Sequence, residues 1–361
     1  MGMKDWCKEK LFNSFLMIKS RPSLVSRIIG EKRITRSDNC DRLPSPRIRV
    51  AAVQMKLHLV KGAREYVEKL YELTRRSVEE GAQLVVFPEY SGTHLLSLIP
   101  GIEKMASGTI EEAISQMVGE EVRVSEVFRS ISPAVKRIYE TAFSTLARRF
   151  GVYIITGSAI LEDDDKRMYN MLYFYGPDGR LISRQKKVHL VQLESKWGFA
   201  TGNDIQVVDT PLGRLAFPIC MDATYFETFR IALLKGADLV IIPSANSEEY
   251  YFWRTMRGIW PRVQESQVYG VGANMVGHFM GITFTGRSCL LAPLELTPNQ
   301  DGFIARAKTF DSEEIVVGEF DYERLHAFRR KNPLEFNEDL YAKYLPSLYE
   351  EAQARRNAGE I

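Results

Sequence analysis

From residue 47 onward, runs of branched apolar residues alternate with stretches in which apolar residues recur at helical spacing. The run RIRVAAVQM at 47–55 predicts a buried strand. The stretch at 61–80 predicts a helix, which ends at Gly81. Three further elements follow: a strand in AQLVVFPEY (82–90, ending at Pro88), a helix at 135–150 and a strand in GVYIITGSAI (151–160).

Two segments in the second half of this pattern predict hairpins. NMLYFYGPDGRLISRQKK (170–187) carries the turn residues Gly-Pro-Asp-Gly between apolar runs, and IQVVDTPLGRLAFPIC (205–220) carries Leu-Gly in the same place. The remaining pattern predicts helices at 225–235 and 253–267 and strands at 237–243, 269–276, 288–293 and 313–320. Because hairpins interrupt the alternation of strands and helices, we predict an α/β fold with two mixed sheets flanked by helices, a four-layer α-β-β-α sandwich.

Charge divides the chain more sharply than its net charge of +2 indicates. Residues 1–49 hold 12 Lys and Arg against five Asp and Glu. Such a segment is either an arm that touches an anionic partner or another subunit, or a solvated or helical extension that covers its own core, and we favour the second interpretation. We divide the chain into a basic extension (1–46), a main domain (47–325) and a helical tail (326–361).

Several classes of protein are disfavoured by composition. No apolar run approaches the roughly 20 residues of a membrane span, and FLMI at 15–18 is too short for a signal-peptide core, so we expect a cytoplasmic protein that binds neither membrane nor nucleic acid. The four cysteines, Cys7, Cys40, Cys220 and Cys289, form no CxxC pair, and the histidines form no HExxH motif. We therefore predict free thiols, no metal and no cofactor.

Three polar residues follow apolar strands at points where a scaffold can present reactive groups: Glu89, Lys187 and Cys220. Alone, each is compatible with a solvated carboxylate, a solvated lysine or a core thiol. Together they form a chemical set, because a thiol needs a base, a partly desolvated glutamate can be that base, and a lysine can stabilise an oxyanion. We therefore predict that the three lie in one active site.

Three blocks of the sequence carry these residues: VVFPEYSG, KKVHLVQLESKWGFATGND and PICMDATYFETFRIALLKGADLVIIPSAN. They resemble the signature blocks of the nitrilase superfamily of carbon–nitrogen hydrolases, and WPRVQESQVYGVGANMVG is similar to a further segment of that family. The resemblance covers 48–320. It implies a catalytic triad of Glu89, Lys187 and Cys220, with Glu194 orienting the lysine and the Met221 N–H helping to hold the oxyanion.

The residues around Cys220 add a local prediction. A strand-to-helix elbow exposes backbone N–H groups that favour a thiolate, and Asp222 and Thr224 are candidate helix caps, with Thr224 and Glu227 at capping-box spacing. His189 is an alternative base, since Cys–His pairs are common. We favour a structural role for it, because the resemblance assigns the base to glutamate.

The function expected from this resemblance is cleavage of a small amide or N-carbamoyl compound through a cysteine thioester, without a cofactor. Family nitrilases commonly carry Trp-Glu after the cysteine, so Met221-Asp222 favours an amidase or carbamoylase. A nitrilase, an acyltransferase that uses the same acyl-enzyme and a non-catalytic scaffold are the alternatives. The resemblance also implies a homodimer or larger assembly, paired through the face of the helix after the cysteine.

Contacts with the substrate are expected from four residues, Met221, Tyr90, Asn246 and Glu248. The loop SANSEEYYFW at 244–253 is acidic and aromatic, and Glu248 or Glu249 is a candidate to attract a cationic amine. A solvated loop is the alternative. Residues 91–134 are expected to form an insertion of loop and helix that contributes to the rim of the pocket.

Overall fold

The computed structural model describes the chain except for residues 1–13, 38–43, 106–107, 119–122 and 358–361. Cys7 and Cys40 therefore lie outside the described residues. By internal contacts the chain divides into two compact units, 1–325 and 326–361. In the second unit the described residues form the end of one helix, α10, and a further helix, α11 (Glu338–Asn357). Nowhere in the described residues is a helix both long and apolar enough to cross a membrane.

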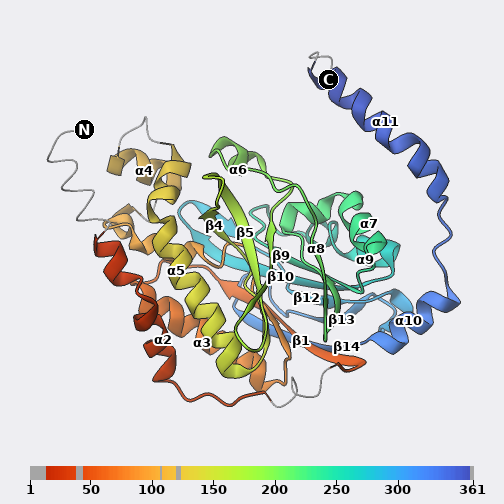
Figure 1. The fold of residues 1–361 in the computed structure, drawn as a ribbon, viewed down its shortest axis with the longest axis horizontal. Helices are drawn as coiled ribbons and strands as arrows, with labels where there is room; N and C mark the ends of the chain where they lie inside the picture. The colour runs from red at the N-terminus through yellow and green to blue at the C-terminus, as the bar shows by residue number, and fades with distance from the viewer. Residues whose placement is uncertain (1–13, 38–43, 106–107, 119–122, 358–361) are drawn as a thin grey trace. The chain divides into compact units, whose positions relative to one another are not determined.

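Strands and helices follow the order that the hydrophobic pattern predicts (Figure 1). The strands are β1 Arg47–Lys56, β2 Leu84–Val86, β3 Tyr153–Ile155, β4 Ala159–Glu162, β5 Met168–Tyr175, β6 Leu181–Lys186, β7 Val207–Thr210, β8 Gly213–Ala216, β9 Leu239–Ser244, β10 Tyr269–Phe279, β11 Ile282–Phe284, β12 Cys289–Leu291, β13 Phe303–Arg306 and β14 Glu314–Asp321. The α-helices are α2 Pro22–Gly30, α3 Ala63–Glu79, α4 Ile110–Val118, α5 Val124–Phe150, α6 Gln192–Lys196, α7 Phe226–Leu234, α8 Phe252–Met256, α9 Trp260–Ser266, α10 Tyr322–Lys331 and α11. Short 3₁₀ helices are η2 Thr93–Leu98, η3 Ile102–Met105, η4 Cys220–Thr224 and η5 Leu294–Leu296.

Strand β1 joins the sheet together, because it pairs with three other strands. It runs parallel to β2 and antiparallel to β14, and its last residues, Met55 and Lys56, pair in parallel with β10. The strands of the described residues thus form one hydrogen-bonded sheet with a central order β4-β5-β3-β2-β1-β10-β9-β8-β7. The α/β class with a mixed sheet is confirmed, whereas the separation into two sheets stays a prediction.

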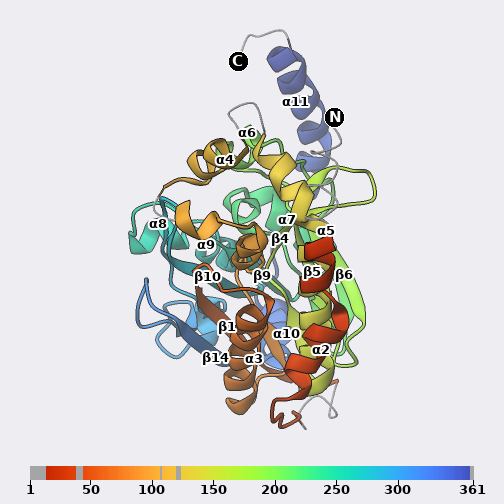
Figure 2. The ribbon, with the colours of Figure 1, turned by 90° about the vertical axis from the view of Figure 1, so that its left-hand side faces the viewer.

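Alternate residues of the buried strands belong to different apolar clusters. Val53 of β1 packs with residues of α3 and α5, whereas Val50 lies in a second cluster with Ile241 of β9. A third cluster lies where β9 packs against α7, α8 and α9, and includes Val240. Figures 1 and 2 show α2, α3 and α5 together over one part of the sheet and α7 to α9 over another. Strands buried on both faces explain the nearly continuous apolar runs in the sequence.

The described part of the basic extension covers its own core. Residues 14–19 are helical, and α2 buries Val25, Ile28 and Ile29 in the cluster that also holds α3 and α5. The guanidinium of Arg137 in α5 donates to Ser20 Oγ at 2.9 and 3.0 Å. Residues 14–19 and 22–30 thus form helices whose apolar residues pack into the core of the main domain, in agreement with the interpretation that we favoured.

Three sequence predictions need correction. The single helix expected at 253–267 is two short helices, α8 and α9, separated by residues 257–259. The helix expected at 135–150 begins at Val124, because apolar residues before Pro133 continue the buried face in spite of that proline. The single strand expected at 151–160 is two strands, β3 and β4. Gly157 lies between them with φ +71°, and a Cβ there would stand 1.9 Å from the Pro88 carbonyl oxygen, so the backbone passes directly beside the segment that carries Glu89.

Candidate active site

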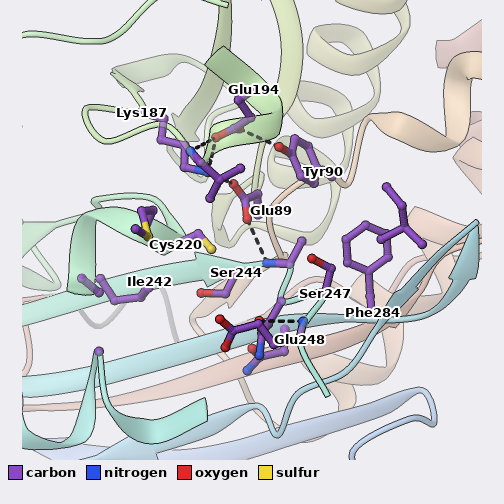
Figure 3. A pocket seen from close by; sticks show the side chains of 18 of the residues that line it. Glu89, Tyr90, Lys187, Glu194, Cys220, Ile242, Ser244, Ser247, Glu248 and Phe284 are labelled. Atoms are coloured by element: carbon purple, nitrogen blue, oxygen red, sulfur yellow. Dashed lines mark hydrogen bonds and ion pairs between the residues drawn. The ribbon is translucent and has the colours of Figure 1, made fainter. Parts of the chain in front are cut away.

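A cavity of about 450 Å³ collects the predicted site residues (Figure 3). All of them line it: Glu89, Tyr90, Lys187, Glu194, Cys220, Met221, Asn246 and Glu248. Strand direction helps to explain this convergence. Glu89 follows β2, Lys187 follows β6 and Asn246 follows β9, and these three strands run in the same direction, so that their carboxyl ends lie at one edge of the sheet. Residues 91–134 also reach the cavity, through Thr93, Ile110 and Phe128, as predicted for an insertion at its rim.

Lys187 lies between two carboxylates at the base of this cavity. Its Nζ is 2.8 Å from Glu89 Oε1 and 2.7 Å from Glu194 Oε2, and all three residues are 1% exposed. Buried charges are stable when they are paired and hydrogen-bonded, which is the case here. A single buried cation therefore holds two buried anions at fixed positions.

Asn170 in β5 is a site residue that sequence reasoning missed. Its Nδ2 donates to Glu89 Oε1 at 2.9 Å and to Glu194 Oε1 at 2.8 Å, so one amide bridges the two carboxylates. Its main-chain carbonyl accepts the Lys187 N–H at 2.9 Å. The available signal was one polar residue inside the apolar strand MYNMLYFY, whose residues are all buried.

Cys220 begins the 3₁₀ helix η4 and has a positive φ of +46°, which is strained for a residue with a side chain. Such strain is typical of functional positions. The thiol lies close enough to Glu89 and to the backbone of Ala245 for both to affect its pKa. The Met221 N–H forms no hydrogen bond to the described residues, so it is free to donate to a ligand in the cavity.

The pKa values of these groups shift in different directions. Burial, and next the charge of Glu89, raise the pKa of the Cys220 thiol well above its ordinary value, which favours the protonated thiol. Burial also raises the pKa of Glu89, although Lys187 opposes this. Burial alone would raise the pKa of Glu194, but Lys187, Tyr90 and Asn170 bring it below its ordinary value. Burial disfavours the charge of Lys187, yet Glu89, Cys220 and Glu194 raise its pKa overall.

Asp222 caps the 3₁₀ helix η4 and not α7, since its carboxylate accepts the N–H of Ile219, the N-cap residue of η4. Helix α7 begins only at Phe226, with Tyr225 as its N-cap residue and without a side-chain cap hydrogen bond, so the predicted capping box of Thr224 and Glu227 is wrong. The buried Asp222 carboxylate instead accepts the N–H groups of Ile219 at 2.9 Å and His189 at 2.6 Å. It thereby ties the segment before Cys220 to the segment after Lys187.

His189 has the structural role that we favoured. Its Nδ1 lies 3.1 Å from Asp222 Oδ1, and its ring lies 4.5 Å from that of Tyr225, measured between centroids. The residue does not line the cavity. The Cys–His alternative is therefore not supported by the geometry.

Tyr90 combines a cavity position with a hydrogen bond to the charged cluster. Its φ is +61°, its N–H donates to Ser158 Oγ at 3.0 Å, and its hydroxyl donates to Glu194 Oε1 at 2.6 Å. Figure 3 shows the ring pointing toward Glu194 from the side of the cavity opposite to Lys187. The hydroxyl that was expected to contact substrate is thus engaged by Glu194.

The mouth of the cavity is more open. Asn246 Oδ1 accepts the Glu248 N–H at 3.2 Å, and the Glu248 carboxylate lies 3.2 Å from the Arg257 guanidinium. Glu249 is exposed and does not line the cavity. Among the described residues, no group of three His, Cys, Asp or Glu side chains could hold a metal ion.

This geometry brings a thiol, two carboxylates and a lysine together in one cavity of a mixed α/β fold. A family model described as "Carbon-nitrogen hydrolase" matches residues 49–330, which is more than half of the chain. The chain therefore belongs to the carbon–nitrogen hydrolase family.

Similar proteins include hydrolases, nitrilases and amidases. The chain is 26% identical over 345 residues to "Probable hydrolase YhcX" of Bacillus subtilis (strain 168), a match that covers 89% of this chain and 61% of that protein. It is 29% identical over 293 residues to "Nitrilase" of Pyrococcus abyssi, covering 81% of this chain and 95% of the other. It is 23% identical over 313 residues to "Omega-amidase NIT2" of Xenopus tropicalis, a match that covers 82% of this chain and 97% of that protein.

A solved structure with a similar fold is that of the amidase from Nesterenkonia sp. AN1. The TM-score is 0.61 at 17% identity, covering 82% of this chain and 96% of the other. That structure has the acetamide moiety of fluoroacetamide added covalently at the active site cysteine of the amidase. At this level of identity the likeness concerns the fold alone.

Proposed function

We propose that the protein hydrolyses the C–N bond of a small amide or N-carbamoyl compound, with Cys220 as nucleophile and Glu89 as general base. The observation that carries this proposal is that the Cys220 thiol shares one cavity with the Glu89 carboxylate, which lies 2.8 Å from Lys187 Nζ and is near enough to the thiol to affect its pKa. A thiol with a raised pKa is a poor nucleophile until a base removes its proton, and Glu89 is the base within reach.

In the first half of the proposed reaction, Glu89 takes the proton of Cys220 while Sγ bonds to the amide carbon. The electron pair of the C=O bond moves to oxygen, and this oxyanion is held by Lys187 Nζ and the free Met221 N–H. Glu89 then gives its proton to the nitrogen, the C–N bond breaks, and ammonia or an amine leaves. The acyl group remains on Cys220 as a thioester.

In the second half, water attacks the thioester carbon while Glu89 takes a proton from it. The new oxyanion uses the same two donors, the C–S bond breaks, and the proton on Glu89 returns to the Cys220 sulfur. The products are a carboxylic acid and the free enzyme. Glu194 and Asn170 act as positioning residues in this scheme, because their hydrogen bonds hold Lys187 and Glu89 without contact with the reacting atoms.

The direct test is ammonia release by the wild type and Cys220→Ala from a panel of aliphatic amides, dicarboxylic monoamides, N-carbamoyl compounds and nitriles. We expect release from amides or N-carbamoyl compounds and its loss, by at least about a thousandfold, in Cys220→Ala. Cys289→Ala is the matched control, since this second described thiol is buried and also lines the cavity but has no part in the proposed reaction, so a loss confined to Cys220→Ala would assign the nucleophile.

The other outcomes select among the alternatives. Ammonia from nitriles alone would make the protein a nitrilase, and amide formation from an amide and an added amine would make it an acyltransferase. Persistence of ammonia release in Cys220→Ala would contradict the proposal, and no release from any compound by the wild type would favour a scaffold without activity.

We also propose that the sheet folds over so that its two halves pack as the layers of an α-β-β-α sandwich. The cluster that contains Val50 of β1 and Ile241 of β9 supports this, because side chains from both halves share one apolar interior.

In addition, we propose a homo-oligomer paired through α7. Its exposed apolar residues Phe226 (41%), Ile231 (42%) and Leu234 (63%) support this. A Leu234→Asp variant that sediments as the wild type does would contradict it.

A further inference from the structure

We propose that the cavity selects amides whose acyl group is a bulky hydrocarbon, such as an arylalkyl group, over short or carboxylate-bearing acyl groups. This inference rests on the proposed function and names the substrate class of the same site. It comes from a set of apolar and aromatic side chains that line the cavity and belong to one apolar cluster, called the apolar wall below.

This apolar wall is assembled from distant parts of the sequence. Its principal residues are Leu57, Ile110, Phe128, Trp197, Phe279 and Phe284. Each of them is at most 7% exposed, although all line the cavity. Figure 3 shows Phe284 turned toward the space below Tyr90. Specificity pockets are typically lined in this way, with a few polar groups at the reacting end.

The insertion at 91–134 holds this wall in place. Phe128 in α5 lies against Trp197 and edge-to-face against Phe199, with ring centroids 6.3 and 5.7 Å apart. The Trp197 indole N–H donates to Glu111 Oε1 in α4 at 2.8 Å. The insertion is therefore joined to the end of α6, the helix that also carries Glu194. A wall braced in this way is formed before substrate binds, which lowers the entropic cost of binding.

Charges in the cavity disfavour an anionic acyl group. Lys187 is already paired with two carboxylates, and Arg257 is paired with Glu248. Among the described residues, Arg254 is the lining cation without an ion pair, and it is exposed at the mouth over the Tyr251 ring, 4.7 Å from its centroid. A carboxylate placed against the apolar wall would lose its hydration without gaining a cation.

The size of the cavity fits a ring-bearing acyl group. An apolar cavity of roughly 150 Å³ accommodates a benzene molecule. The cavity here measures about 450 Å³ and so has room for an aromatic ring, a short alkyl linker and the amide at Cys220. A short aliphatic amide would leave most of the wall in contact with water, and that contact is unfavourable.

The test compares kcat/KM for ammonia release from phenylpropionamide, propionamide and succinamic acid, which is a monoamide with a free carboxylate. We expect phenylpropionamide to exceed each of the others by at least about tenfold, since burying a ring removes a large apolar area from water. Equal or higher kcat/KM for propionamide or succinamic acid would overturn the inference.

Two variants with opposite effects on volume locate the selectivity in this wall. Phe128→Ala enlarges the cavity and Ile110→Trp fills it, and each should lower the ratio of kcat/KM for phenylpropionamide over propionamide at least about fivefold. Phe143→Ala is the matched control, because Phe143 is a buried residue of the same helix α5 that does not line the cavity. It should leave the ratio within about twofold. A ratio unchanged in both wall variants would overturn the inference.

Binding separates this inference from the proposed reaction. Calorimetric titration of Cys220→Ala with phenylpropionamide and with propionamide measures selectivity without turnover, and we expect the first to bind at least about tenfold more tightly. Selective binding together with a wild type that releases no ammonia would contradict only the proposed function. Equal binding, with ammonia released by the wild type, would contradict only the inference.

Discussion

Glu89 and Glu194 are two carboxylates in nearly the same surroundings, yet their pKa values shift in opposite directions. Both are buried, both lie within 2.8 Å of Lys187 Nζ, and both accept a hydrogen bond from Asn170. The pKa of Glu89 is raised by burial, whereas that of Glu194 is lowered. Burial and a shared lysine therefore do not decide the charge state of a carboxylate in this site.

The difference lies in the remaining partners of each group. Glu194 accepts two further hydrogen bonds, from the Tyr90 hydroxyl at 2.6 Å and the Val191 N–H at 2.9 Å, and all such donors favour the anion. Glu89 accepts one N–H, from Ala245 at 2.9 Å, and otherwise faces the Cys220 thiol, and the negative charge of Glu194 opposes its ionisation. These contacts support the proposed roles, in which Glu194 stays charged and Glu89 exchanges a proton.

The largest expected effect comes from removal of the exchangeable proton site. Glu89→Gln keeps the size of the side chain but cannot take the Cys220 proton, so kcat should fall by about 10²- to 10⁴-fold. Glu140→Gln is the matched control, because burial also raises the pKa of this carboxyl, which does not line the cavity. Steady-state kinetics on the best amide of the panel measure both variants. A Glu89→Gln enzyme within tenfold of wild type would contradict the assignment of the base.

A smaller loss of kcat is expected when the carboxylate of Glu194 is replaced by a neutral amide. In Glu194→Gln, Lys187 keeps Glu89 but loses one charge-assisted hydrogen bond, worth roughly 1.5–3 kcal/mol, which corresponds to about a 10- to 100-fold loss of kcat. In this variant kcat/KM should still decrease at low pH, since Glu89 still becomes protonated there. If Glu194→Gln instead abolished that decrease and Glu89→Gln preserved it, the two roles would have to be exchanged.

Stability should depend on pH with opposite sign for the two groups. The lowered pKa of Glu194 means that its carboxylate stabilises the fold above pH 4.5, its ordinary value, and that this stabilisation is lost as the pH falls through the lowered pKa. The raised pKa of Glu89 means that its contribution is greatest below pH 4.5 and is lost as the pH rises through the raised pKa.

Urea unfolding at pH 7 and near pH 4 measures this difference. The free energy of unfolding of wild type relative to Glu194→Gln should be higher at pH 7 than near pH 4. The free energy of unfolding of wild type relative to Glu89→Gln should be higher near pH 4 than at pH 7. A difference of one unit between the pKa of a group in the folded and in the unfolded protein changes the free energy of unfolding by about 1.4 kcal/mol. If these two differences in the free energy of unfolding changed with pH in the same direction, the opposite pKa shifts of Glu89 and Glu194 would be refuted.

The smallest effect is expected from one donor of Glu194. Tyr90→Phe removes the hydroxyl but leaves Lys187, Asn170 and the Val191 N–H on the carboxylate, so kcat should fall by about fivefold, in line with roughly 1 kcal/mol for one hydrogen bond. Tyr139→Phe is a suitable control. The Tyr139 hydroxyl donates to the Thr156 carbonyl at 2.9 Å, and Tyr139 does not line the cavity. Equal losses of kcat in both variants would indicate a general effect on stability.

Much of this site was predictable from the sequence, because its principal residues follow strands whose apolar runs are easy to recognise. Glu89, Lys187 and Cys220 each come after such a strand, and β2, β6 and β8 run in the same direction, so that their carboxyl ends lie at one edge of the sheet. Asn170 was missed because it lies within a strand, where its meaning depends on which residues of other strands face it. Its polarity in an all-apolar strand was the one local signal.

The fold was predictable where local pattern and tertiary burial agree. Strand β1 and helix α3 match the predicted ranges closely, since their apolar residues have a clear period. The start of α5 before Pro133 could not be derived, because tertiary packing of Phe128 and Ile131 outweighs a local break signal. The break between β3 and β4 depends on the close approach of Gly157 to Pro88, a contact between segments distant in sequence.

The measurement that tests the account most directly is the rate of Cys220 alkylation by iodoacetamide, followed by peptide mass spectrometry between pH 4 and 9. In the wild type and in Glu194→Gln, the rate should rise with pH as Glu89 ionises, with a midpoint above 4.5 because burial raises the pKa of Glu89. In Glu89→Gln, alkylation near pH 7 should be at least about tenfold slower. Alkylation of Glu89→Gln at the wild-type rate, with slowing only in Glu194→Gln, would contradict the division of roles between the two carboxylates.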